Sequence, residues 1–69
     1  MISAVPVVLE GQEDPLVGRV RVALNVPGGN VLDRPLMELL RGVQRGNGLD
    51  PHGELDERTL GLFGLMPVY

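Results

Sequence analysis

The sequence predicts a small, mainly α-helical fold of three short helices preceded by an extended N-terminal arm. Two observations predict it. Apolar residues recur at helical spacing in three segments, and an aspartate that can cap a helix stands before each segment. The connecting segments are rich in glycine, proline and asparagine, which are typical of turns. We divide the chain into an arm (1–12), a three-helix domain (13–65) and an apolar tail (66–69).

The arm contains a valine-rich segment from Ile2 to Leu9, whose composition predicts a strand or an extended conformation. Pro6 has no N–H group to donate to a neighbouring strand, so a central place in a sheet is not expected. Gly11 and Gln12 end the segment.

The first helix is expected from Pro15 to about Leu24. Asp14 is its expected cap, and proline at the first helical position loses no hydrogen bond. Gly18 and the valines make it a weak helix by propensity. The sequence NVPGGN at 25–30 then predicts a turn.

The second helix is predicted most clearly. Asp33 is its expected cap, and Pro35 falls in its first turn. Arg41 and Gln44 are expected on the side opposite its apolar face, and Glu38 can pair with Arg41 one turn away. The predicted apolar face comprises Leu36, Leu39, Leu40 and Val43.

Glycines and aspartates set the boundaries of the remaining elements. The left-handed conformation expected at Gly46 and Gly48 ends the second helix. The third helix is expected from Glu57 to Phe63, between the cap Asp56 and the terminating Gly64. Its expected inward side carries Thr59, Leu62 and Phe63.

A shift of 23 residues aligns the two halves of the domain. In each half a leucine precedes the capping aspartate, and an apolar residue lies at the fourth helical position, which is the pattern of a hydrophobic staple. We predict two copies of one turn–staple–helix unit around a shared core; chance matching of the 12 leucines is the alternative. The aligned pairs are Val20/Val43, Val26/Leu49, Asn30/Gly53, Leu32/Leu55, Asp33/Asp56, Met37/Leu60 and Leu39/Leu62.

Composition argues against several classes of partner and site. Six arginines, no lysine and nine acidic residues give a net charge of −3, whereas nucleic-acid-binding domains normally carry a basic surface. Without cysteine and with one histidine, neither a disulfide nor a multi-histidine zinc site is expected. No segment approaches the roughly 20 apolar residues of a membrane span. Reading Met1 as the chain start, we find no secretory signal and expect a cytoplasmic or virion location.

The residues that could carry catalysis point to structural roles instead. Ser3 lies in the arm, far from the one histidine, and the hydroxyl of Thr59 is expected to bond backbone. His52 could titrate near neutral pH, but a solvated turn histidine is the simpler interpretation. We therefore expect neither an enzyme nor a cofactor.

The acidic cluster of Asp50, Glu54 and Asp56 raises two further alternatives. Paired carboxylates serve glycoside hydrolysis, but that reaction needs a cleft that 69 residues can hardly form. A calcium loop is also rejected, because Leu55 occupies the position where such a loop needs glycine. Capping and solvated loop positions are the expected roles.

The pattern of conspicuous residues from the end of the second helix onward is, in order, Val43-Gln44, Gly48-Leu49, Gly53, Leu55, Asp56, Thr59 and Leu62. In this order and nearly in spacing it resembles the signature of the peptidoglycan-binding-like domain family, and the resemblance covers about Leu16 to Leu65. It implies a compact three-helix fold with a pseudo-repeat, and a scaffold used for cell-wall binding and for protein contacts, including contacts in virus particles. His52 departs from the family's acid before the glycine, and Phe63 and Tyr69 are the only aromatic residues. In the first half, Asn30 and Leu36 replace a glycine and a threonine. The matching residues, expected to be structural, are Gln44, Gly48, Leu49, Gly53, Leu55, Asp56 and Thr59.

The apolar arm and tail suggest contact with a partner protein, although the arm could equally pack on its own helices. We expect a non-catalytic module for protein–protein contact, specifically an accessory protein (minor capsid or decoration) of a bacteriophage virion. A peptidoglycan-binding module that accompanies a lytic enzyme is the alternative, and an intracellular regulator is a third. The expected partner-binding residues are Ile2, Val5, Val7, Val8, Leu9, Met66, Val68 and Tyr69.

Overall fold

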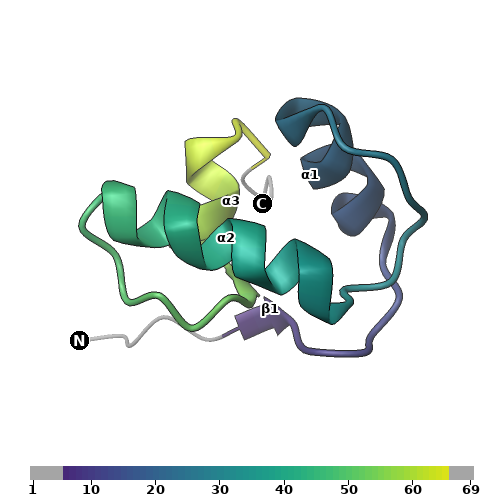
Figure 1. Cartoon of the computed structure of the whole chain (residues 1–69), viewed down its shortest axis with the longest axis horizontal. Coiled ribbons are helices and arrows are strands. Elements are labelled where there is room, and N and C mark those ends of the chain that lie inside the picture. The colour runs from purple at the N-terminus through teal and green to yellow at the C-terminus, as the bar shows by residue number, and fades with distance from the viewer. Residues whose placement is uncertain (1–5, 66–69) are drawn as a thin grey trace.

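The computed structural model describes residues 6–65. Within this range three α-helices pack together beside a two-stranded antiparallel sheet, so the predicted mainly α fold is confirmed (Figure 1). The elements in chain order are β1 (Pro6–Val8), α1 (Pro15–Leu24), α2 (Arg34–Gly46), β2 (Leu55–Asp56) and α3 (Glu57–Leu62).

All three predicted caps are confirmed. Asp14, Asp33 and Asp56 are the N-cap residues of α1, α2 and α3, and each side chain accepts a hydrogen bond from a backbone N–H of the first helical turn. Asp33 accepts from Leu36 at 3.1 Å and Asp56 accepts from Thr59 at 2.8 Å, both at the third helical position. A cap satisfies one of the backbone N–H groups that a helix start leaves unpaired.

Hydrophobic staples anchor the entries of α2 and α3. Leu32 and Leu55, which precede the caps, are fully buried; of their partners one turn into each helix, Leu60 is fully buried and Met37 is buried to 5 % exposure. Burial of both members fixes the direction in which the chain enters the helix. The core that they help to form consists of Val8, Val17, Val20, Leu32, Leu36, Met37, Leu40, Leu55 and Leu60.

The buried face of α2 differs from the predicted one. Leu39 is 47 % exposed, whereas Met37 and Gln44 are buried. Relative to the predicted orientation, α2 is turned about its axis so that Gln44 faces the interior and Leu39 faces solvent. The amide of Gln44 favours this orientation because it finds hydrogen-bond partners inside the domain. The expectation that Gln44 faces outward is therefore wrong, while the predicted pair of Glu38 and Arg41 is confirmed at 2.6 Å.

The helix ends follow the prediction with small differences. Gly48 and Gly64 adopt positive φ values of 74° and 71°, as expected for residues that terminate helices. Gly46 is instead the last residue of α2, and Asn47 caps the helix. α3 ends at Leu62, one residue before the predicted end.

The described part of the arm packs on its own domain. β1 pairs antiparallel with β2, placing Val8 opposite Leu55, and Val8 is 1 % exposed. Further along, Gly11 N–H donates to the Leu32 carbonyl at 2.8 Å, and Leu32 N–H donates to the Gln12 carbonyl at 3.0 Å. This N-terminal segment, residues 6–13, therefore runs past both staple leucines, below α2 in the view of Figure 1.

These contacts correct part of the expected partner surface. Val8 is a core residue, because strand alternation turns it inward, whereas Val7 and Leu9 on either side are 38 % and 41 % exposed. The other expected contacts, Ile2, Val5, Met66, Val68 and Tyr69, lie outside the described residues.

Between residues 6 and 65, no helix is long and apolar enough to cross a bilayer.

Substitution of Val8 tests the packing of the N-terminal segment. Val8→Ala removes buried methyl groups and is expected to lower the free energy of unfolding by about 1–3 kcal/mol. Val7→Ala, at an exposed position of the same strand, is expected to change it by no more than about 0.5 kcal/mol. Urea unfolding followed by circular dichroism measures both, and equal effects of the two substitutions would contradict the packing described above.

Candidate functional site

The buried amide of Gln44 joins α2 to the segment that leads into α3. Its Nε2 donates to the Glu54 carbonyl and to Thr59 Oγ1, both at 2.9 Å, while its Oε1 accepts from Gly53 N–H at 2.8 Å. Gln44 and Thr59 are both 0 % exposed. Because unpaired polar groups are costly in an apolar interior, these three bonds fix the loop against the helix.

The close fit around Gly53 requires glycine. Its φ is 85°, in the left-handed region, and a Cβ at this position would lie 3.1 Å from the Met37 carbonyl oxygen and 3.1 Å from Arg41 Nε. Any side chain here would push the loop away from α2 and lengthen the hydrogen bond to Gln44.

His52 and Asp56 form a second set of contacts in the same loop. Glu54 N–H donates to His52 Nδ1 at 2.9 Å, so this nitrogen is the acceptor, and Nε2 is left to donate to Asp56 Oδ2 at 2.9 Å. The side chain of His52 is 27 % exposed. The interpretation of His52 as a solvated turn residue is therefore wrong, because both ring nitrogens organise the loop.

Opposing effects set the acidity of Asp56. Burial by itself raises the pKa of this carboxyl group, but the hydrogen bonds from Thr59 N–H and from the His52 ring outweigh it and hold the pKa below its ordinary value. The group is therefore a carboxylate at neutral pH, which is the form that the cap of α3 and the contact with His52 both use.

The residues on which the sequence resemblance rests thus lie together. Gln44, Gly53 and Thr59 share direct hydrogen bonds, and Asp56 caps α3 beside them. Leu49 N–H donates to the Gln44 carbonyl at 2.8 Å, Gly48 takes the left-handed conformation before it, and Leu55 is buried. Thr59 was expected to bond backbone; its hydroxyl instead accepts from the buried amide of Gln44.

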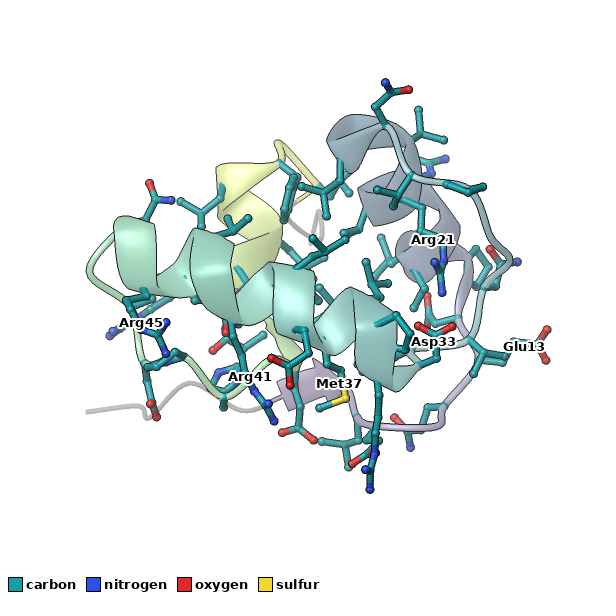
Figure 2. All side chains as sticks on the ribbon, viewed as in Figure 1. Glu13, Arg21, Asp33, Met37, Arg41 and Arg45 are labelled. Atoms are coloured by element: carbon teal, nitrogen blue, oxygen red, sulfur yellow. The ribbon has the colours of Figure 1, made fainter. Side chains whose placement is uncertain are left out.

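A third network, which sequence reasoning missed, surrounds Arg21. This arginine of α1 is 7 % exposed, and its guanidinium donates to the carbonyls of Pro27, Gly29 and Val31 at 2.9–3.0 Å. It also pairs with Asp33 at 3.1 Å, as the two labelled side chains in Figure 2 show. It therefore holds the whole connection between α1 and α2.

Arg21 and Gln44 occupy equivalent positions, because they are separated by the 23 residues of the predicted duplication. Each lies near the end of a helix, and each holds the backbone of the loop that leads to the next helix. The backbone bonds repeat at the same offset: Val26 N–H donates to the Arg21 carbonyl, as Leu49 N–H does to the Gln44 carbonyl. Leu65 N–H donates to the Leu60 carbonyl in the same way at the end of α3, so this bond is a common helix ending and the duplication remains a prediction.

The left-handed residues of the two halves also correspond, but not as predicted. Asn25, with φ 59°, is equivalent to Gly48, with φ 74°. The expected pairing of Asn30 with Gly53 fails, because only Gly53 has a positive φ. The side-chain oxygen of Asn30 instead occupies the space beside Gly18.

The carboxyl group of Asp33 is more acidic than an ordinary aspartate. The hydrogen bond from Leu36 N–H is the main cause of its lowered pKa, and the hydrogen bond and charge of Arg21 add to it. The carboxylate of Asp33 thus has two roles: it caps α2, and it pairs with Arg21, which holds the preceding loop.

The described surface includes a groove with charged walls beside α2. This groove of about 170 Å³ is lined by Glu10, Arg34, Met37, Glu38 and Arg41. Among the described residues there is no group of three or more acidic, histidine or cysteine side chains that could hold a metal ion. Within the same range every buried side-chain nitrogen and oxygen has a hydrogen-bond partner.

Comparison of the chain with protein-family models, with curated proteins and with solved structures gives no match.

Replacement of Gln44 tests the central network. Gln44→Leu keeps a side chain of similar size but leaves Gly53 N–H and the Glu54 carbonyl without their partner, so we expect a loss of about 2–4 kcal/mol in the free energy of unfolding. Gln12→Leu is the matched control: Gln12 is exposed, and its side chain accepts one exposed hydrogen bond from Leu9 N–H, so about 1 kcal/mol is the expected limit. Denaturant titration gives both values, and similar stability of the two variants would show that the buried amide is dispensable.

The lowered pKa of Asp33 predicts how the free energy of unfolding changes at acidic pH. Its carboxylate stabilises the fold fully above the unfolded value of about 3.9, and this stabilisation is lost as the pH falls through the lower folded value. The difference in unfolding free energy between the wild type and Asp33→Asn should therefore be constant from pH 7 to about 5 and shrink at lower pH. Thermal melts across this range measure it, and a difference that persists undiminished at about pH 2 would refute the assignment.

Proposed function

We propose that the chain is a non-catalytic module that binds another protein, and that its N-terminal segment supplies part of the binding surface. The main support for the proposal is the alternation of buried and exposed apolar side chains along this segment. Val8 is buried in the core, while Val7 and Leu9 on either side remain 38 % and 41 % exposed. Two apolar side chains held beside an ordered strand form a rigid contact, which reduces the entropy lost on binding.

The hydrogen bonds of Thr59 and His52, the residues that could otherwise serve catalysis, support structural roles for both. Thr59 is fully buried and bonded to Gln44, and both ring nitrogens of His52 are occupied by contacts within the loop. A general base must reach a proton of its substrate, and a nucleophile must reach the reacting carbon. Each of these side chains instead holds the fold.

A protein partner is favoured over a glycan. Phe63, the one aromatic residue among the described positions, is partly buried and packs against the core. Sugar-binding surfaces commonly present exposed aromatic rings, whereas the exposed apolar side chains here are aliphatic: Val7, Leu9, Val22, Val31, Leu39 and Leu62.

The specific role that we propose is that of an accessory protein, minor capsid or decoration, of a bacteriophage virion. The apolar N-terminal segment and the resemblance of the motif to the peptidoglycan-binding-like domain support this role. Fold alone does not fix function, so the proposal depends on a binding test.

The test is co-sedimentation of the purified chain with capsids assembled from the major capsid protein of the same genome. The wild type is expected to bind, and Val7→Asp/Leu9→Asp is expected to weaken binding at least about tenfold, because two charges enter an apolar contact. Deletion of the whole segment would not serve, since it also removes the core residue Val8.

Val22→Asp/Leu62→Asp is the matched control, because it places two charges at exposed apolar positions on α1 and α3. It should bind like the wild type, and circular dichroism should show that both variants are folded. Absence of binding, or equal losses in the two variants, would overturn the proposal. Retention on purified peptidoglycan that survives Val7→Asp/Leu9→Asp would favour the cell-wall function.

A further inference from the structure

One side of α2 carries a stripe of charged residues: Arg34, Glu38, Arg41 and Arg45. Their spacing of four, three and four residues places them on one face of the helix. Figure 2 shows the labelled Arg41 and Arg45 on the same side of α2. At a rise of about 1.5 Å per residue, the stripe is about 16 Å long. We call these four residues the arginine stripe.

The stripe borders the groove described above. Met37, which is 5 % exposed, forms its apolar floor, and Glu10 from the N-terminal segment forms the opposite wall. Arg34 pairs with Glu10 at 3.3 Å and Arg41 pairs with Glu38 at 2.6 Å. The arginine side chains in these pairs are 88 % and 40 % exposed, so solvent screens both interactions.

The arginines of the chain are concentrated on this face of α2. Three of the six arginines of an acidic chain lie on the stripe, and a fourth, Arg21, is buried in α1. Among the described residues, Arg45 has no ion-pair partner, and the pairs of Arg34 and Arg41 can be exchanged at little cost because they are exposed. The guanidinium groups are therefore available to carboxylates of another molecule, which they can bind in a two-pronged geometry.

We propose that the arginine stripe is a docking surface for an acidic segment of a partner protein. Carboxylates of that segment would face Arg34, Arg41 and Arg45, and one of its side chains would enter the groove above Met37. This inference rests on the proposed function as a protein-binding module and names the chemistry of the partner. It concerns a different surface from Val7 and Leu9.

Carboxylates fit this surface better than a nucleic-acid backbone does. Glu10 and Glu38 stand between the arginines and repel a continuous row of phosphates, whereas a protein segment can place a neutral or basic residue opposite them. The chain also has a net charge of −3, which opposes the long-range attraction that nucleic-acid binding uses.

The test is an NMR titration of the full ¹⁵N-labelled chain with a decaglutamate peptide at low salt. Amide signals of α2 from Arg34 to Arg45 are expected to shift, and added salt should reverse the shifts because the interaction is electrostatic. Arg34→Glu/Arg45→Glu is expected to weaken binding at least about tenfold. Both side chains point into solvent, so the variant should stay folded.

Arg19→Glu/Arg58→Glu is the matched control, because it makes the same change in net charge at exposed arginines of α1 and α3. It should weaken binding by no more than about twofold, through long-range charge alone. Equal losses in the two variants, shifts spread over the whole chain, or no shifts at all would overturn the docking site. Tighter binding of an oligothymidylate of equal charge would assign the stripe to nucleic acid instead.

The two proposals can fail separately. Binding of capsids that depends on Val7 and Leu9, without any response of the stripe to the peptide, would retain the proposed function and reject the docking site. Specific binding of the peptide at the stripe without capsid binding would retain an acidic protein partner and reject the virion role.

Discussion

The fold depends on the buried side-chain amide of Gln44. The loop before α3 is buried at Gly53, where the N–H of Gly53 and the carbonyl of Glu54 lie against α2 and need partners. An apolar residue at this position would fill the space but leave both groups unpaired. One amide satisfies both and also fixes Thr59, so the loop and two helices become a single unit.

Twice along the chain, a buried polar side chain of one helix binds the backbone of the loop that leads to the next helix. Arg21 holds the loop before α2, and Gln44 holds the loop before α3, each from the equivalent point of the preceding helix. The two solutions differ in chemistry: a guanidinium reaches three carbonyls and a carboxylate, whereas an amide reaches one N–H, one carbonyl and a hydroxyl. Two loops that each lead into a capped helix are therefore held by side chains of unrelated chemistry.

The sequence predicted the helices, caps and staples well because these features depend on neighbours in the chain. Asp33 next to Leu32 is enough to place a helix start, whatever the rest of the domain does.

The face of α2 was predicted wrongly because its orientation depends on distant groups, the backbone of Gly53 and Glu54, which a helical pattern does not contain. The roles of Arg21 and His52 were missed for the same reason: nothing in their immediate sequence distinguishes a buried guanidinium or an engaged imidazole from a solvated one. The arginine stripe could have been read from its spacing, but the groove beside it depends on Glu10, which only the fold brings there.

The N-terminal segment leaves the ribosome before the helices do, yet its core residue Val8 packs only when Leu55 has joined the sheet. Contacts between such distant residues carry a loop-closure cost and slow folding. The staple at Leu32 can form earlier, but the interior stays open until β2 has emerged and paired with β1. A stable core therefore requires the chain from β1 to β2, and a nascent chain stalled before β2 would expose its leucines to chaperones and proteases.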